Sequence, residues 1–227
     1  MRTLKLLLAP VLLLASCNID DGRNNGFGNN CVDGTGPLVN ETRSFSSFHS
    51  ISNNGVGNIL LTQGTQEDVT IEAQANILQI LKTEVVDETL VISLVDGQCI
   101  NSITETVTFT VSIPEIKNLE LDGVGDFNTQ NDIALDSLNL KLNGVGNFGL
   151  TGSSDYLDID LTGVGNVEAF DLSTSFCDIV ISGVGTANVT VSDTLNVVIV
   201  GQGTVSYKGN PEINSDITGN GEVVNAN

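Results

Sequence analysis

The sequence predicts an all-β protein, a parallel β-solenoid (β-helix) with about 18 to 21 residues per turn and a less regular β cap at its N-terminal end. Three observations carry this prediction. Gly-x-Gly recurs at intervals of 21, 19, 20, 18 and 18 residues from Gly123 onward. Apolar and polar residues alternate on both sides of each Gly-x-Gly, as in half-buried strands. The 227 residues include 24 glycines and no tryptophan, which favours a β protein with glycine corners.

Each repeat is expected to form a strand, a corner and a second strand. The position two residues before each Gly-x-Gly is aliphatic throughout the regular part: Leu121, Leu142, Leu161, Ile181, Ile199 and Ile217. The position two residues after it is also apolar: Phe127, Phe148, Val167, Ala187, Val205 and Val223. Glycine suits a corner because it tolerates positive φ and lets two backbones approach closely. The predicted corner residues are Gly55, Gly57, Gly123, Gly125, Gly144, Gly146, Gly163, Gly165, Gly183, Gly185, Gly201, Gly203, Gly219 and Gly221.

A single unit of this kind cannot bury its apolar face, whereas copies stacked about 4.8 Å apart bury continuous apolar columns. A β-sandwich or a propeller is the alternative architecture. A propeller blade needs about 40 residues, and antiparallel hairpins would not keep aliphatic residues in fixed register with one corner. The solenoid is therefore preferred.

One polar column is as regular as the apolar ones. The position five residues before each Gly-x-Gly is always Asn or Asp: Asn118, Asn139, Asp158, Asp178, Asn196 and Asn214. We interpret this column as a ladder of side-chain hydrogen bonds. Calcium binding is the alternative, because Ca²⁺ needs several converging oxygen ligands, but asparagine separates most of the aspartates. With one histidine and no Cys-x-x-Cys, the sequence predicts no metal site and no cofactor.

Residues 34–227 are predicted to form the solenoid domain, with the regular turns in 117–227. Residues 34–116 are expected to form irregular early turns and a cap, because the regular spacing of Gly-x-Gly is lost there. A cap is needed because a bare sheet edge recruits other chains. Within this part, the apolar spacing of residues 74–82 fits one or two helical turns.

Residues 1–16 have the pattern of a lipoprotein signal peptide. Two basic residues precede an apolar run over residues 6–15 that is too short for a membrane-spanning helix. The run ends in Leu14-Ala15-Ser16-Cys17, which resembles the lipobox at which bacterial lipoproteins are cleaved and acylated, for example with palmitate. We therefore predict a membrane anchor on Cys17. An ordinary secretory signal followed by a chance cysteine is the alternative.

Residues 17–33 are rich in Asn, Gly and Asp and are predicted to be a flexible tether. Asn18, directly after the cysteine, resembles the signal for retention in the outer membrane. Asp20 and Asp21 resemble surface-export signals of some Gram-negative lipoproteins, or they are simply a solvated charge pair. The predicted location is the cell envelope, as an outer-membrane lipoprotein exposed at the surface, with a periplasm-facing protein as the alternative.

Three cysteines remain after the one assigned to lipidation. Cys177 begins an alternating apolar run and fits a buried small hydrophobic residue. Cys31 and Cys99 both lie in glycine-containing loop sequence, and by elimination they are the candidate disulfide pair.

The chain is strongly acidic, with 28 Asp and Glu against 8 Lys and Arg and a formal net charge of −20. Proteins that bind nucleic acid present a basic face, so we predict no nucleic-acid partner. A carbohydrate-active β-helix enzyme is an alternative function, and it would need two converging carboxylates. Asp158 and Asp160 are the best candidates, with Asp155 and Asp178 nearby.

Two tripeptides, Asp136-Ser137-Leu138 and Asp193-Thr194-Leu195, resemble an O-glycosylation sequon that some Gram-negative bacteria use on exported proteins. Ser137 and Thr194 are therefore candidate acceptors, although such tripeptides are also common by chance.

Several motifs together resemble one known family. Gly34-Thr35-Gly36 is followed by Glu41-Thr42-Arg43, and Tyr207-Lys208-Gly209-Asn210-Pro211 precedes the last Gly-x-Gly. With the repeated Gly-Val-Gly corners, these motifs make residues 34–225 similar to the putative auto-transporter adhesin, head GIN domain family. The resemblance implies a β-helical lipoprotein of the cell envelope without catalytic residues. The expected function is an adhesin-like module that binds a surface glycan or a protein, in an oligomeric state that the sequence leaves open.

Overall fold

The structure is a computed structural model that describes residues 31–227. The predicted signal peptide, the lipidation site Cys17 and the tether up to residue 30 lie outside the described residues. Among residues 31–227, no helix has both the length and the apolar character needed to cross a membrane.

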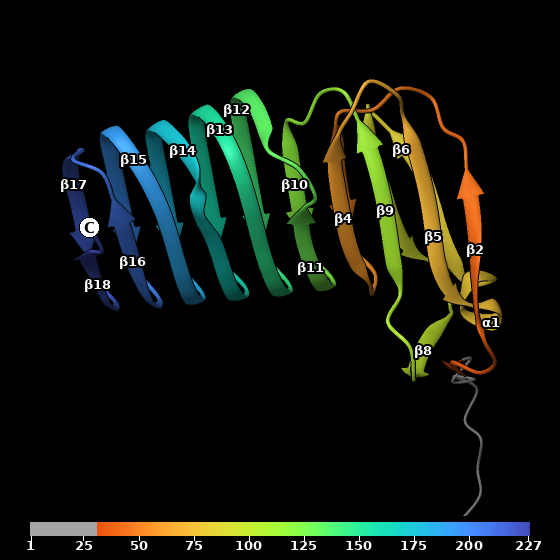
Figure 1. Cartoon of the computed structure of the whole chain (residues 1–227). Helices are drawn as coiled ribbons and strands as arrows, with labels where there is room; N and C mark the ends of the chain where they lie inside the picture. The colour runs from red at the N-terminus through yellow and green to blue at the C-terminus, as the bar shows by residue number, and fades with distance from the viewer. Residues whose placement is uncertain (1–30) are drawn as a thin grey trace, which may run out of the picture.

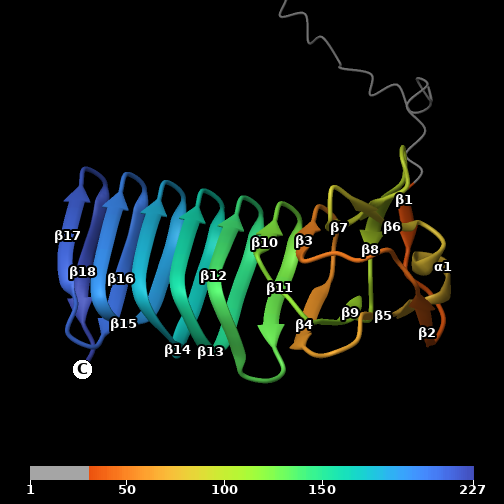
Figure 2. The same ribbon diagram turned by 90° about the horizontal axis from the view of Figure 1, so that it is seen from above.

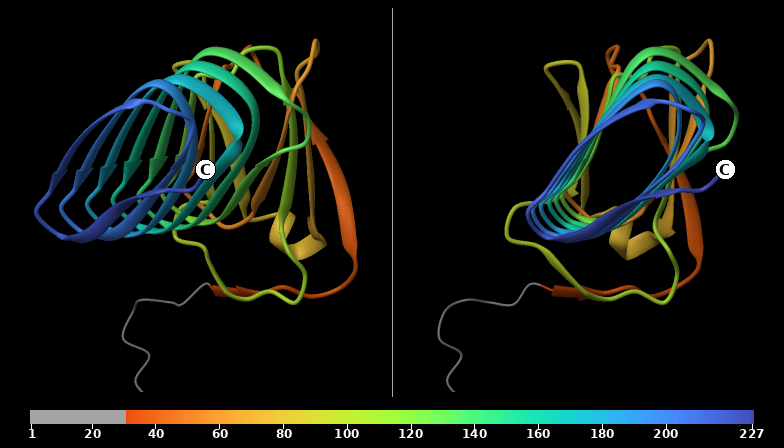
Figure 3. Two further views of the ribbon diagram at one scale, coloured as in Figure 1. Left: turned by 60° about the vertical axis from the view of Figure 1, so that its left-hand side comes forward. Right: turned by 90° about the vertical axis from the view of Figure 1, so that its left-hand side faces the viewer.

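Residues 118–225 coil into a regular parallel β-solenoid of about five turns (Figure 1). Its strands are β10 (Asn118–Leu121), β11 (Val124–Thr129), β12 (Ile133–Leu142), β13 (Val145–Leu161), β14 (Val164–Ile181), β15 (Val184–Ile199), β16 (Gln202–Lys208), β17 (Glu212–Ile217) and β18 (Asn220–Asn225). All pairings between successive turns are parallel. Viewed along the axis, the turns superimpose as one flattened coil (Figure 3). The predicted fold class is confirmed.

The apolar columns of the sequence form the core of this coil. Leu140, Ile159 and Ile179 lie opposite one another on β12, β13 and β14, and each is at most 2 % exposed. After the corner, Phe127 and Phe148 are fully buried and their rings stack with centroids 5.1 Å apart. Alternation along each strand therefore sends every second side chain into the interior.

The glycine corners are required mainly because successive turns touch there through their backbones. A Cβ atom on Gly144 would overlap the carbonyl oxygen of Gly123 in the preceding turn, and one on Gly146 would overlap that of Gly125. The same overlap with the preceding turn recurs at both glycines of every later corner. Positive φ is found at only some of them, such as Gly146 at +155°, so close approach is the more general cause.

Residues 31–116 combine further parallel turns with an antiparallel cap (Figure 2). The strands are β2 (Leu38–Arg43), β3 (Ser50–Asn53), β4 (Asn58–Gln63), β5 (Asp68–Gln74), β6 (Leu81–Val86), β7 (Thr89–Leu94) and β9 (Thr108–Ile113). The pairs β3–β10, β3–β7 and β4–β9 are parallel and extend the coil. The pairs β2–β5, β5–β9 and β6–β7 are antiparallel and close its end. The helical segment expected over 74–82 is only α1 (Ala75–Leu78), because Leu81 already enters β6.

A small separate sheet lies beside the cap. Strand β1 (Cys31–Asp33) pairs in parallel with β8 (Cys99–Ser102), and a disulfide joins Cys31 to Cys99 with their Cα atoms 4.2 Å apart. Residues 31–33 are therefore a strand and not the end of the predicted tether, because they pair with β8. The Asp33 carboxylate accepts hydrogen bonds from Ser102 and Asn101, which lowers its pKa. The free thiol of Cys177 is buried in the core, and burial raises its pKa.

Candidate interaction site

One outward surface of the solenoid carries the candidate functional residues, and we call it the outer face. It consists of the outward side chains that precede the Gly-x-Gly corner, arranged in three parallel columns. The first column is Ser137, Tyr156, Phe176, Thr194 and Glu212. The second is Asn118, Asn139, Asp158, Asp178, Asn196 and Asn214. The third is Glu120, Lys141, Asp160, Val180, Val198 and Asp216.

The second column forms the expected ladder of side-chain hydrogen bonds, but with a gap. On one side, the Asn139 amide donates to Asn118 over 2.9 Å. On the other, the Asn196 amide donates to Asp178 over 2.6 Å, and the Asn214 amide donates to Asn196 over 2.9 Å. Among residues 31–227, no side-chain hydrogen bond joins Asp158 to Asn139 or to Asp178. Two carboxylates in register cannot bond to each other when both are ionised, so the ladder stops there.

Another polar column, just after the Gly-x-Gly corner, forms a continuous ladder from Asp126 to Thr186. The Asp126 carboxylate accepts from the backbone and side-chain N–H groups of Asn147, both over 2.8 Å. Asn147 accepts in the same way from Asn166, which accepts in turn from Thr186. The second column is therefore interrupted at Asp158 and Asp178 in turns where the column after the corner stays bonded.

An exposed aromatic pair lies beside this gap. The rings of Tyr156 and Phe176 stack with centroids 5.8 Å apart, and the two residues are 42 % and 44 % exposed. The Tyr156 hydroxyl donates to the Asp178 carboxylate over 3.0 Å, and this bond raises the pKa of Tyr156. Partial desolvation, with Asp178 and Asp160 as like charges nearby, raises the pKa of Asp158.

The carboxylates proposed for the enzyme alternative lie on an open surface. Asp158 and Asp160 are two residues apart on β13, so both point outward from a sheet, with Asp158 exposed and Asp160 half-buried. General acid and base catalysis on a glycoside needs two carboxyl groups on opposite sides of the scissile bond. Neighbouring side chains on one face of one strand do not provide that arrangement.

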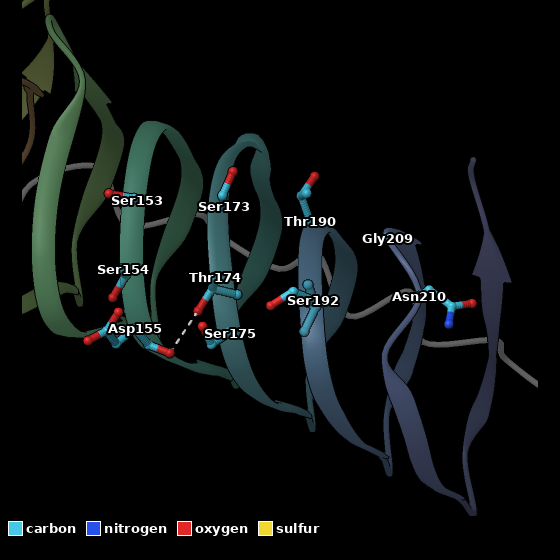
Figure 4. A pocket seen from close by; sticks show the side chains of 11 residues that line it. Ser153, Ser154, Asp155, Ser173, Thr174, Ser175, Thr190, Ser192, Gly209 and Asn210 are labelled. Carbon is cyan, nitrogen blue, oxygen red and sulfur yellow. Dashed lines mark hydrogen bonds between the residues drawn. The ribbon is translucent and has the colours of Figure 1, made fainter.

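A shallow hydroxyl-rich groove runs along the solenoid corner next to the aromatic pair (Figure 4). Its volume is about 550 Å³, and its lining includes Ser153, Asp155, Ser173, Ser175, Ser192 and Asn210. Ser154 and Thr174 also line it but are largely buried, and their hydroxyls donate to the backbone oxygens of the aromatic residues two positions later, over 2.6 and 3.0 Å. These bonds fix the direction in which each strand leaves the corner and presents its ring.

The candidate glycosylation residues lie in the same column as the aromatic pair. Ser137 pairs in register with Tyr156, and Thr194 pairs with Phe176, so the two hydroxyl residues border the rings on either side. Within the described residues, no cluster of three His, Cys, Asp or Glu side chains could hold a metal ion.

The buried columns, the glycine corners and the exposed aromatic face define the chain as a parallel β-solenoid with a candidate binding surface. The chain belongs to the family described as putative auto-transporter adhesin, head GIN domain, whose sequence model matches residues 47–211. This confirms the resemblance inferred from the motifs. Membership indicates a protein of the cell surface or envelope, and both the family and a solved structure with the same fold are described as putative adhesins. No curated protein matches the chain.

Solved structures share the fold. A putative adhesin from Bacteroides fragilis is 25 % identical, with a TM-score of 0.71 over 86 % of this chain and 99 % of its own. A putative lipid binding protein from Parabacteroides distasonis is 21 % identical, with a TM-score of 0.56 over the same shares of the two chains. A putative adhesin from Parabacteroides merdae is 19 % identical, with a TM-score of 0.53, also over 86 % and 99 %. The last two similarities concern the fold alone.

Asp158→Asn is expected to raise the melting temperature near neutral pH. The raised pKa of Asp158 means that its ionised form is less favourable in the folded protein than in the unfolded chain, whose pKa is near 3.8. This cost is present above the folded pKa and vanishes as the pH falls below the unfolded value. Because the side chain is exposed, the gain should be below about 1 kcal/mol.

Thermal unfolding of the wild type and the variant near pH 7 and near pH 3 checks this prediction. The difference should be present at the higher pH and absent at the lower one. Asp171→Asn, an exposed aspartate outside the outer face, is the matched control and should give a smaller gain. A variant that melts no higher than the wild type near pH 7 would contradict the argument.

Proposed function

We propose that the chain is a non-catalytic lipoprotein of the outer membrane whose solenoid serves as an adhesin-like interaction module at the cell surface. The observation that carries this proposal is the exposed aromatic pair, Tyr156 and Phe176, on the outer face of a protein that belongs to an adhesin family. Stacked aromatic side chains that are exposed to water mark binding surfaces, because burying them on contact contributes more to the free energy of binding than burying most other side chains.

The repetitive fold supports this role. Each turn is held to the next by in-register backbone pairing over long strands, 17 residues in β13 and 18 in β14. Side chains on such strands keep fixed positions, so a binding surface built on them needs little ordering when a partner arrives. The proposed anchor would hold this surface at the membrane, where multiple contacts between cell and target add up.

The membrane anchor is tested by Cys17→Ala. Without the acylated thiol, the protein should move from the membrane fraction to the soluble fraction of lysed cells, because the acyl chains supply the membrane affinity. Cys177→Ala is the control, since it removes a cysteine from the core and should leave the protein in the membrane fraction. Unchanged membrane retention of the Cys17→Ala protein would refute the anchor.

The adhesin role is tested with cells that lack the protein and cells that produce it. Cells with the protein should bind to at least one surface in a panel of immobilised glycans and matrix proteins, and cells without it should lose that binding. Added protease should degrade the protein on intact cells if it faces outward. Equal binding by both strains on every surface, with the protein protected from protease, would overturn the surface role and favour the periplasm-facing alternative.

A further inference from the structure

We propose that the outer face binds arginine side chains of a basic segment on a partner protein, through Tyr156 and Phe176 and the carboxylates of Asp158 and Asp178. This inference rests on the proposed function, because it names the class of partner for the same surface. Three features of the face lead to it: the gap in the ladder, the excess of negative charge and the exposed rings.

The gap in the ladder leaves an excess of hydrogen-bond acceptors. Asn139 uses its amide N–H to reach Asn118, and Asp158 in the next turn, when ionised, has no donor for the Asn139 oxygen. Asp158 in turn lies in register with Asp178. Asparagine at both aspartate positions would allow the ladder to continue, as it does on both sides. Residues that interrupt a regular pattern of stabilising hydrogen bonds are candidates for function.

The charge of the outer face favours a cationic partner. Its three columns contain six carboxylates, Glu120, Asp158, Asp160, Asp178, Glu212 and Asp216, against one lysine, Lys141. That lysine lies 3.1 Å from the Glu120 carboxylate, in the direction of the N-terminal cap. In the described part of the chain, no salt bridge involves Asp158, Asp160 or Asp178. A cation that bound here would relieve the repulsion between these carboxylates.

The described residues 31–227 of a second copy do not fit this requirement. The described Lys and Arg side chains are all engaged elsewhere. Four of them, Arg43, Lys82, Lys117 and Lys141, pair with nearby glutamates. The fifth, Lys208, lies over the ring of Phe170 at 4.3 Å from its centroid. Self-association through the outer face would therefore bring two acidic surfaces together, which like charges disfavour.

The aromatic pair selects arginine among cationic groups. A guanidinium group is planar, stacks on aromatic faces and carries five N–H donors for neighbouring carboxylates. A lysine ammonium group is more strongly hydrated and cannot stack as a plane. Val180 and Val198, 36 % and 37 % exposed in the third column, lie across the carboxylate row and would contact apolar parts of the same segment. An arginine-rich segment thus matches both the apolar and the acidic part of the face.

The experiment measures binding of a hexa-arginine peptide to the full-length protein in detergent micelles by isothermal titration calorimetry. The double variant Tyr156→Thr and Phe176→Thr leaves the net charge unchanged. Threonine is chosen because the next residue of the same column is Thr194. This double variant should bind hexa-arginine at least about tenfold more weakly, because cation–π contacts with two rings are lost. Asp158→Asn combined with Asp178→Asn should weaken binding at least as much.

The controls separate a defined site from general attraction to an acidic protein. Asp132→Asn combined with Asp171→Asn makes the same change in charge outside the outer face and should weaken binding less than about twofold. Hexa-lysine should bind the wild type several-fold more weakly than hexa-arginine does. Circular dichroism of each variant reports whether the fold is kept.

Three results would overturn the inference. The first is hexa-arginine binding that the aromatic double variant leaves unchanged. The second is an equal loss of binding in the control double variant. The third is that neutral oligosaccharides, tested as cellohexaose and chitohexaose, bind the outer face while hexa-arginine does not. Any of these results, combined with adhesion that still depends on the protein, would remove the partner class and leave the proposed function standing.

Discussion

Gly146→Ala is expected to lower the free energy of unfolding by about 4 kcal/mol, because the new Cβ would overlap the backbone of the preceding turn. The atom it meets is the carbonyl oxygen of Gly125, and Cδ2 of Leu121 lies only 2.8 Å from the same position. The carbonyl cannot move away freely, because the pairs Val124–Val145 and Asp126–Asn147 on either side of the glycines hold the two turns in register. The φ of +155° at Gly146 adds strain for any residue with a side chain. Chemical denaturation followed by circular dichroism measures the change.

Two matched variants separate the causes of this effect. Gly97→Ala also places a side chain at positive φ, +75°, but nothing lies within 4 Å of the new Cβ, so it should cost only about 1 kcal/mol. Val145→Ala changes the exposed residue of the same corner and should be nearly neutral, within about 0.5 kcal/mol. If Gly146→Ala proved as mild as Gly97→Ala, backbone contact between turns would not be the reason for the glycine columns.

Phe148→Ala is expected to cost about 3 to 5 kcal/mol, because it removes a fully buried ring from the core. The ring stacks on Phe127 of the preceding turn at 5.1 Å, and the fixed spacing of the turns prevents the cavity from closing. Denaturant unfolding under the same conditions gives the value.

Phe176→Ala provides the comparison, since Phe176 also stacks on an aromatic ring of the preceding turn but is 44 % exposed. Its removal should cost less than about 1 kcal/mol. The contrast between the two phenylalanines tests whether the inward columns stabilise the fold while the outer face is available for binding. Similar losses from both substitutions would assign the Tyr156–Phe176 pair a structural role.

The regular half of the fold was predictable because its sequence repeats once per turn. Leu140, Ile159 and Ile179 occupy the same position relative to successive corners, and in-register stacking follows directly from that regularity. The corner glycines were predicted, but the backbone atoms that exclude a side chain from each of them were not. The carbonyl oxygen that excludes a side chain at Gly146 belongs to another turn, and only the stacked structure shows it.

The cap was less predictable because its strands have no common spacing. Antiparallel pairing of β2 with β5 and of β6 with β7 depends on contacts between segments that carry no repeated motif. Strand β1 was missed because three residues of ordinary loop composition become a strand only through pairing with β8 and the Cys31–Cys99 disulfide.

The candidate site was only partly visible in the sequence. The column of Asn and Asp was recognised, but the gap between Asp158 and Asp178 emerges only when the hydrogen bonds of each turn are known. The aromatic pair was missed because Tyr156 and Phe176 are 20 residues apart and meet only in register. The signal was present, since both occupy the outward position seven residues before a Gly-x-Gly.

The central claim is that the outer face of this solenoid mediates binding at the cell surface. The most direct test compares the adherence of three strains to protein-coated and glycan-coated surfaces. One strain produces the wild type, one lacks the protein, and one produces the variant with Tyr156→Thr and Phe176→Thr at an equal surface level. We predict that the wild-type strain adheres to at least one surface and that the other two do not. Equal adherence of all three strains on every surface would contradict the claim.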